Sequence, residues 1–232
     1  MSLFDRSYMR PEQPRGGKPD DGSSMIWSLL LANVLVYLLF SSEVATLALS
    51  WGGLRGFKVY QLVTAGFFHQ DFSHIFFNMW GLYLFGKLVA PHLGSARFLI
   101  LYLIGVVSGN LLFLLFNWNS TVPVIGASGA IAGVMGAYFR LFPRARVVTL
   151  IPIIIIPWIV ELPAVVFLGI WFAVQLFSGL SGSLSMGGAG EVAFWAHVGG
   201  FAAGLFLVRR FLPLGCRYCF DPRQRRYDRE TP

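Results

Sequence analysis

Four polar side chains that could together carry out acyl transfer stand in apolar stretches of this 232-residue chain. Ser128 lies between two glycines in GASGAIAG, and His197 lies in AHVGG. His74 and Asn78, in HIFFN, are four residues apart and would share one face of a helix. A hydroxyl, an imidazole and an amide are the groups that serve as nucleophile, general base and oxyanion donor in acyl transfer. The sequence therefore predicts a candidate site for this chemistry.

The composition predicts that these residues lie in a membrane. Hydrophobic residues make up 56% of the chain and charged residues only 12%, against about 25% charged residues in soluble domains. The pI near 9.8 is expected to reflect membrane topology and contact with anionic lipid headgroups. We therefore expect the lipid bilayer as a partner and do not expect nucleic acid.

Six apolar segments predict an all-α membrane protein with six transmembrane helices. Each segment should be helical because lipid offers no partner for an unpaired backbone group. The shorter ones are expected to extend into flanking residues such as 64–73. A further stretch, TLIPIIIIPWIVELP, is broken by prolines and is interpreted as an interfacial or re-entrant entry to the fifth helix. The six predicted segments are 26–40, 74–89, 98–116, 124–141, 162–177 and 192–211.

The positive charges predict the orientation. With six helices, sixteen of the 18 Lys and Arg residues fall on one side, and Arg55 and Lys58 on the other. Positive residues mark the cytoplasmic side, so both termini are predicted to be cytoplasmic. The expected location is the cytoplasmic (inner) membrane of a bacterium. The predicted organisation is a disordered N-terminal tail (1–24), a six-helix domain (25–211) and a basic C-terminal tail (212–232).

Glycines favour close contact between the fourth and sixth predicted helices. Gly200 and Gly204 follow His197 on nearly the same helix face, while Gly129, Gly133 and Gly136 form a second bare stripe about 100° from Ser128. Such stripes let two backbones approach closely. They would bring a short serine side chain within reach of His197, although ordinary helix packing explains glycines equally well.

Interhelical hydrogen bonding is the competing explanation for isolated polar residues. It is about as good as the functional one for His74 and Asn78, and better for Ser108 and Asn110. The pair Cys216 and Cys219, in CRYC, is only half of a zinc site. A pair of thiols is favoured over a metal site shared across a dimer, so no metal is predicted. No cofactor is predicted either.

Together these motifs resemble the rhomboid family of intramembrane serine proteases, from about Gln61 to Leu207. GASGAIAG matches the family's Gly-x-Ser-Gly motif, HIFFN matches His-x-x-x-Asn, and AHVGGFAAG matches Ala-His-x-Gly-Gly. The resemblance implies a six-helix rhomboid fold with Ser128 as nucleophile and His197 as general base. It also implies an oxyanion hole made by the side chains of His74 and Asn78 and the Ser128 backbone N–H, with Gly126 and Gly129 as motif glycines.

Two departures from the family pattern concern how the site is held. Many relatives carry a Trp-Arg pair where this chain has Tyr60 and Gln61. Some relatives place an aromatic residue four positions after the nucleophile, to pack on the catalytic imidazole, where this chain has Ala132. Another group, such as Phe194 or Trp195, must then hold the His197 ring. Neither Glu161 nor Glu191 is placed convincingly beside His197, which favours a Ser-His dyad over a triad.

The predicted function is that of an intramembrane serine endopeptidase that cleaves transmembrane segments of other membrane proteins near the outer membrane surface. One alternative is a non-catalytic rhomboid-like protein that binds membrane clients, although such a protein has no use for both Ser128 and His197. A small transporter is a second alternative, but it would favour ionisable groups at the membrane midplane on broken, repeated helices.

The segment SGLSGSLSMGGAG, residues 178–190, contains five glycines, four serines and no charge. This composition predicts a mobile loop over the site. Leu184 or Met186 is expected to point toward the dyad, and the fifth helix is expected to admit substrate laterally.

Overall fold

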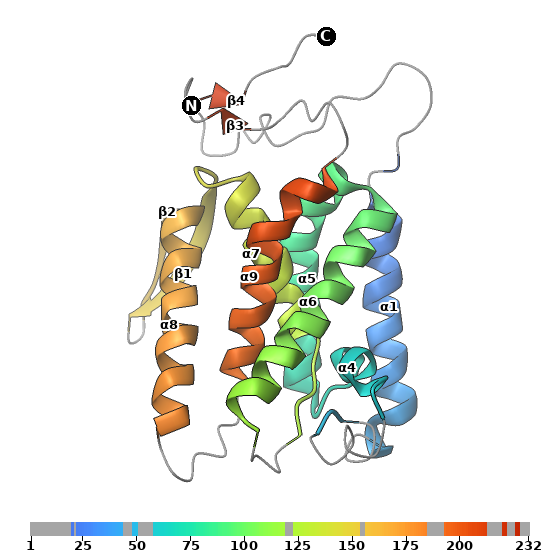
Figure 1. The fold of residues 1–232 in the computed structure, drawn as a ribbon. Coiled ribbons are helices and arrows are strands. Elements are labelled where there is room, and N and C mark those ends of the chain that lie inside the picture. The colour runs from blue at the N-terminus through green and yellow to red at the C-terminus, as the bar shows by residue number, and fades with distance from the viewer. Residues whose placement is uncertain are drawn as a thin grey trace.

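The chain folds mainly into long helices that run side by side as a bundle (Figure 1). The computed structural model describes residues 20, 22–43, 48–50, 58–118, 123–153, 156–184, 193–212, 220–221 and 226–227. Its long helices are α1 (Ser23–Phe40), α5 (Phe72–Leu93), α6 (Ser95–Phe116), α7 (Ser128–Leu141), α8 (Ala164–Leu184) and α9 (Phe194–Phe211). The shorter elements are η2 (Ser41–Glu43), α4 (Gln61–Thr64), η3 (Ala65–Phe67), β1 (Arg146–Ile153), β2 (Ile156–Pro163), β3 (Phe220–Asp221) and β4 (Arg226–Tyr227).

The six predicted helices are therefore all found, with differences at their ends. The fourth begins at Ser128 and not at Val124, because Val124 pairs with Leu49 in an antiparallel bridge. Residues 64–73 do not extend the second helix. Thr64 ends α4, η3 follows, and α5 begins only at Phe72, where the Asp71 side chain caps it. A side-chain cap of this kind fixes the first residue of a helix.

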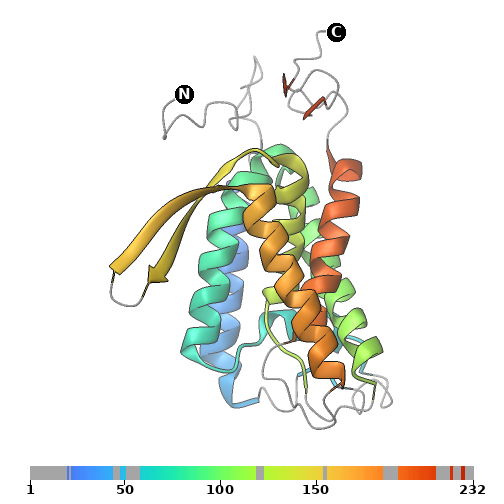
Figure 2. The same ribbon diagram turned by 90° about the vertical axis from the view of Figure 1, so that its left-hand side faces the viewer.

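The stretch predicted as an interfacial or re-entrant entry to the fifth helix forms a β-hairpin. The re-entrant form is therefore wrong, and the interfacial position stays a prediction. β1 pairs antiparallel with β2, from Arg146 opposite Pro163 to Ile153 opposite Ile156. Residues with branched β-carbons favour strands, and Pro152 and Pro157 face each other near the far end of the hairpin. The hairpin extends away from the helices (Figure 2).

The predicted loop over the site is wrong in its first half. Ser178 to Leu184 continue α8 as regular helix, while residues 185–192, including Met186, lie outside the described part of the chain. Glycine and serine are poor helix formers in water. In an apolar environment the helix is favoured because it pairs the backbone groups that water would otherwise solvate. Gly179 also packs against α9, where a Cβ atom would lie 3.1 Å from the Trp195 ring.

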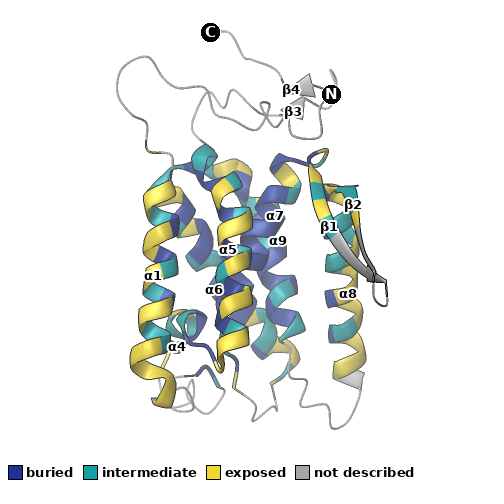
Figure 3. Ribbon diagram, turned by 180° about the vertical axis from the view of Figure 1, so that it is seen from behind, coloured by how far each residue is buried: buried dark blue, intermediate teal, exposed yellow. Residues whose placement is uncertain are grey.

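The outer surface of the bundle exposes more large apolar side chains than the surface of a water-soluble protein does. Trp27, Phe77, Phe177 and Phe206 are each more than 60% exposed, and exposed residues cover the outer helices α1 and α5 (Figure 3). Among the described residues, α1, α6 and 164–182 of α8 are long and apolar enough to cross a membrane. Large continuous apolar surfaces mark contact with lipid or a partner. Length and composition thus identify three spans and do not establish six.

Helix α7 forms the centre of the bundle. It contacts α5, α6 and α9, and eleven of its 14 residues are buried. The exposed helices surround it (Figure 3). With only 14 residues, α7 is also shorter than its neighbours, and an extended segment leads up to its first residue, Ser128 (Figure 2). Helix α7 therefore starts with a half-buried residue, Ser128.

The two predicted glycine stripes meet face to face, which confirms the expected close packing of α7 and α9. A Cβ atom on Gly200 would collide with the backbone oxygen of Gly129, and one on Gly204 would collide with that of Gly133. On the other helix, a Cβ atom on Gly136 would collide with the oxygen of Phe201. The two backbones are in direct contact, so no larger side chain fits between them.

Hydrogen bonds between distant segments join the remaining elements. Buried Asn33 on α1 donates to the Tyr102 hydroxyl on α6 over 3.2 Å, and Asn110 on α6 donates to the Leu62 carbonyl over 2.9 Å. Ser108 donates to the Ile104 carbonyl of its own helix. The predicted interhelical hydrogen bond is therefore confirmed for Asn110, whereas Ser108 bonds within α6.

Replacing Gly204 by Ala should destabilise the protein, because the new methyl group meets backbone atoms that cannot rotate away. Overpacking of this kind costs about 1–3 kcal/mol. Gly169→Ala is the matched control, since nothing lies within 4 Å of a Cβ atom at that helical position. Thermal unfolding in detergent should show a lowered midpoint for Gly204→Ala and an unchanged or raised one for Gly169→Ala. Equal midpoints for both variants would contradict the contact between the backbones.

Candidate functional site

Ser128 is the first residue of α7 and is half-buried. The preceding residue, Ala127, has no side chain that could cap the helix, and its carbonyl accepts from the Ile131 N–H over 3.0 Å. The amides of Ser128, Gly129 and Ala130 thus belong to the first turn, whose N–H groups have no partner within the helix. Such a helix end carries partial positive charge and suits a developing anion.

The approach to Ser128 is fixed from two sides. The Val124 and Leu49 backbones exchange hydrogen bonds of 2.9 and 3.1 Å, and the Gly126 N–H donates to the Ala65 carbonyl over 2.9 Å. Gly126 has a φ of 113°, which residues with a side chain rarely adopt. A Cβ atom there would also lie 2.6 Å from Nε2 of His74. The motif glycine is therefore required both by its backbone conformation and by the imidazole beside it.

His74 and Asn78 stand at the beginning of α5, on one face as predicted. The Asp71 carboxylate accepts from the His74 N–H over 2.8 Å and from the Ser73 hydroxyl over 2.6 Å. Asn78 is buried, and its side-chain amide donates to the His74 carbonyl over 2.8 Å. This hydrogen bond uses one of the two N–H groups of the amide, so one donor remains.

A third histidine, which the sequence analysis missed, supports His74. The buried ring of His69 meets the His74 ring edge to face, with 5.0 Å between centroids. Burial, and next the like charge of His74, lower the pKa of His69 to about 4, despite raising effects of the Phe67 carbonyl and Asp71. His69 therefore stays neutral near pH 7 and acts as packing for His74. Its position five residues before His74 could have suggested that the two rings lie close together.

His197 is the fourth residue of α9 and is half-buried. Two residues of α8 contact its ring. Nδ1 lies 2.7 Å from Oε1 of Gln175, and the Trp171 ring lies 5.9 Å away between centroids. Phe194 and Trp195 are the predicted candidates for this role, but Trp195 instead stacks on Phe116 at 3.7 Å between centroids.

The sequence offered a signal for Gln175 that was overlooked. It is the polar side chain in the apolar run AVVFLGIWFAVQLF. A polar residue inside a membrane helix is a candidate functional residue by default. The same rule selected Asn78.

The structure brings the predicted site residues to one end of the bundle. Gly129, next to Ser128, faces the carbonyl of Ala196, next to His197, with 3.5 Å between that oxygen and a Cβ atom on the glycine. His74 lies beside Gly126, two residues before Ser128. Glu161 is not part of this cluster, since it pairs with Arg146 in the hairpin at 3.6 Å. Glu191 lies outside the described residues.

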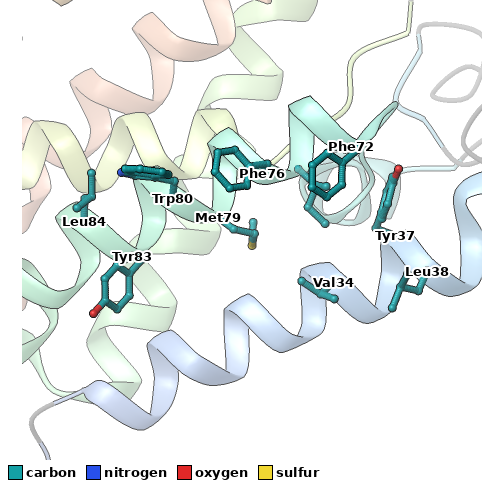
Figure 4. A pocket seen from close by; sticks show the side chains of 10 residues that line it. Val34, Tyr37, Leu38, Phe72, Phe76, Met79, Trp80, Tyr83 and Leu84 are labelled. Atoms are coloured by element: carbon teal, nitrogen blue, oxygen red, sulfur yellow. The ribbon is translucent and has the colours of Figure 1, made fainter. Parts of the chain in front are cut away.

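An apolar pocket of about 590 Å³ between α1 and α5 is separate from this cluster (Figure 4). Its lining on α5 includes Ile75, Phe76 and Met79, which lie on other faces of the helix than His74 and Asn78. Its lining includes the phenols of Tyr37 and Tyr83 but no histidine, serine, cysteine or carboxylate. Among the described residues no cluster of three metal-ligating side chains occurs, and Cys216 and Cys219 fall outside them.

An apolar helical bundle with polar side chains gathered at one end defines an integral membrane protein with a recessed polar site. Residues 56–213 match the family model described as the Rhomboid domain. The match covers more than half of the chain, so the protein belongs to the rhomboid family.

Three relatives illustrate the similarity. Rhomboid protein 1, mitochondrial, of Saccharomyces cerevisiae is 31% identical over 137 residues, which is 53% of this chain and 38% of the relative. RHOMBOID-like protein 12, mitochondrial, of Arabidopsis thaliana is 29% identical over 203 residues, covering 75% and 58%. The putative rhomboid protease YdcA of Bacillus subtilis is 29% identical over 121 residues, covering 47% and 58%. The matches span less than two thirds of each relative's length.

Asp71 is expected to stabilise the site through its cap on α5. The Ser73 hydroxyl, and then the His74 N–H, lower the pKa of this exposed carboxyl. A lowered pKa in the folded state means that the stabilisation is complete above the ordinary carboxyl pKa of about 3.9. It is lost as the pH falls through the lower folded value.

Asp71→Ala should therefore lower the thermal midpoint at pH 7, whereas Asp71→Asn, which keeps a capping oxygen, should lower it less. Midpoints measured in detergent from about pH 2 to 7 provide the test. The difference in thermal midpoint between the wild type and Asp71→Asn should disappear at the acidic end of this range. A gap that is constant with pH would show that the Asp71 charge is not involved.

Proposed function

We propose that this protein is an intramembrane serine endopeptidase that cleaves transmembrane segments of other membrane proteins. The main support is the glycine contact between α7, which carries Ser128, and α9, which carries His197. This contact lies next to both residues. Membership in the rhomboid family adds to this support, because the names of relatives such as YdcA describe a protease.

In the proposed reaction, His197 accepts the Ser128 hydroxyl proton as Oγ attacks the scissile carbonyl carbon. The carbonyl oxygen becomes an oxyanion, which the Ser128 N–H and the side chains of Asn78 and His74 stabilise. When the tetrahedral intermediate collapses, the C–N bond breaks and protonated His197 gives its proton to the leaving amine. Water then hydrolyses the acyl-enzyme in the same way, with His197 again as base. The residues named here need neither metal nor cofactor for these steps.

The position of Ser128 fits chemistry inside a membrane. Ser128 begins α7, the shortest of the six long helices, and its side chain is half-buried. Both an extended substrate backbone and water must reach it for hydrolysis. An oxyanion is stabilised most strongly by fixed donors where water is scarce. The amides of the first turn of α7 and the amide of Asn78 are such donors. A cut near the outer membrane boundary follows if both termini are cytoplasmic.

The proposed topology has six transmembrane helices, namely the three identified spans together with α5, α7 and α9. The first residue of α1 and the last residue of α9 lie at the same end of the bundle (Figure 1), as an even number of crossings requires. The expected location in a bacterial cytoplasmic membrane is not supported by the relatives' names, two of which are mitochondrial. Proteins that contain the substrate segments are the proposed partners.

The alternative is a client-binding protein without catalysis. Such a protein would bind membrane segments equally well without the Ser128 hydroxyl. Covalent labelling of the purified protein with a fluorophosphonate probe separates the two functions, because the probe reacts only with an activated serine.

Ser128→Ala and His197→Ala should each abolish both probe labelling and cleavage of a model transmembrane substrate in liposomes. The thermal midpoint of Ser128→Ala should stay close to that of the wild type, because this small change leaves the α7 and α9 backbone contact intact. That of His197→Ala should fall somewhat, because buried Gln175 loses its hydrogen-bond partner. Mass spectrometry of the products gives the position of the cut. Cleavage that persists in either variant would rule out the dyad.

Asn78→Ala should have a milder effect, because the backbone amide and His74 remain as donors. The loss of one oxyanion donor costs about 10²–10³ in kcat. The loss should appear in kcat and leave KM nearly unchanged, since the donor acts mainly on the transition state. An unchanged kcat would remove Asn78 from the proposed oxyanion hole.

A further inference from the structure

Gln175 reaches His197 from a different helix, within a buried stripe of α8. Leu168, Trp171, Gln175 and Gly179 follow one another at intervals of three or four residues and so share one face. Leu168 is fully buried, and Gln175 is only 8% exposed. Gly179 packs on Trp195, two residues before His197. By contrast, neighbouring residues such as Val174 and Phe177 are exposed on the outer face.

The chemistry of an amide oxygen determines what this contact does. Oε1 of Gln175 can only accept a hydrogen bond, so the proton must be on Nδ1 of His197, which donates over 2.7 Å. A neutral imidazole carries one proton, and Nε2 is then left with a free lone pair. A general base needs such a lone pair, and the partner of the other ring nitrogen determines which nitrogen has it.

The Trp171 ring complements the hydrogen bond. It lies 5.9 Å from the His197 ring at an interplanar angle of 32° and also contacts Phe201. Ala132, four residues after Ser128, is too small to fill this place and is itself buried in the core. The support of the imidazole therefore comes from α8, through one hydrogen bond and one aromatic ring, and not from α7.

We propose that Gln175 is a positioning residue that holds His197 in the tautomer and orientation of a general base. This inference rests on the proposed function of His197. A neutral amide takes the role that a carboxylate has in serine hydrolases with a triad, where the third residue fixes the imidazole tautomer. A neutral group suits a membrane interior, because a buried carboxylate would need a partner charge. Because Gln175 lies on α8, the orientation of the His197 imidazole also depends on the position of α8.

Gln175→Met tests the role of the acceptor, because methionine has a similar length and no acceptor of comparable strength. Val174→Met is the matched control, since it places the same side chain one residue earlier on the exposed face of α8. We expect Gln175→Met to lower kcat by about 10- to 100-fold, as loss of an orienting partner does at other sites. KM should stay unchanged, and the rate of fluorophosphonate labelling should fall in parallel. Val174→Met should match the wild type.

Gln175→Glu supplies a readout that a purely structural residue would not change. Glutamate keeps the acceptor oxygen, so activity should return at high pH. Its negative charge stabilises the protonated imidazole, so the acidic limb of the kcat/KM profile should move upward by about one pH unit or more. The base must be unprotonated to act, and activity would therefore be lost at a higher pH than in the wild type.

Two results would overturn the positioning role. In the first, Gln175→Met keeps kcat within about twofold of Val174→Met. In the second, both Gln175 variants lose activity only in proportion to a lowered thermal midpoint, with the acidic limb unmoved. Ser128→Ala is assayed in parallel, because its result tests the proposed protease function separately from the role of Gln175. Cleavage by that variant would refute the protease itself, whatever the Gln175 variants do.

Discussion

The direct contact between the α7 and α9 backbones is the constraint on which the rest of this structure depends. Glycines 129, 133, 200 and 204 leave no side chain between the two helices. In lipid, helices gain little from hydrophobic association, so close packing of backbones provides much of the attraction. The contact also determines the site, because Ser128 and His197 are each next to a residue that takes part in it. One packing device thus holds the core together and brings together the groups proposed to react.

The apolar surroundings explain the other main features of the fold. They permit exposed tryptophan and phenylalanine side chains on the outer helices and favour helix where the sequence is rich in glycine and serine, as at the end of α8. They also make each polar group inside the bundle costly unless it is paired. Asn33, Asn78, Asn110 and Gln175 all have hydrogen-bond partners, three of them on another element. The polar residues therefore report which helices are neighbours.

Sequence reasoning was most reliable where composition and periodicity acted over many residues. The six helices, the rhomboid family and the contact of the glycine stripes could all be predicted. It was less reliable where short segments decide between similar energies. The apolar run from Thr149 to Pro163 is compatible with a strand or with a re-entrant segment. The pairing of β1 with β2 decides in favour of the hairpin. The start of α7 shifted to Ser128 because Val124 found a partner in Leu49, 75 residues away.

The sequence by itself determined the environment, the helices and the identity of the residues that could do chemistry, because these follow from side-chain type and spacing along one segment. Only the tertiary structure decided what surrounds them. The partner of His197 could not be derived from spacing, since Gln175 is 22 residues away on a helix whose rotation depends on its packing against α9. The need for Gly126 likewise became clear only when the His74 ring was found beside it. Contacts between helices depend on the placement of whole elements, which no local pattern encodes.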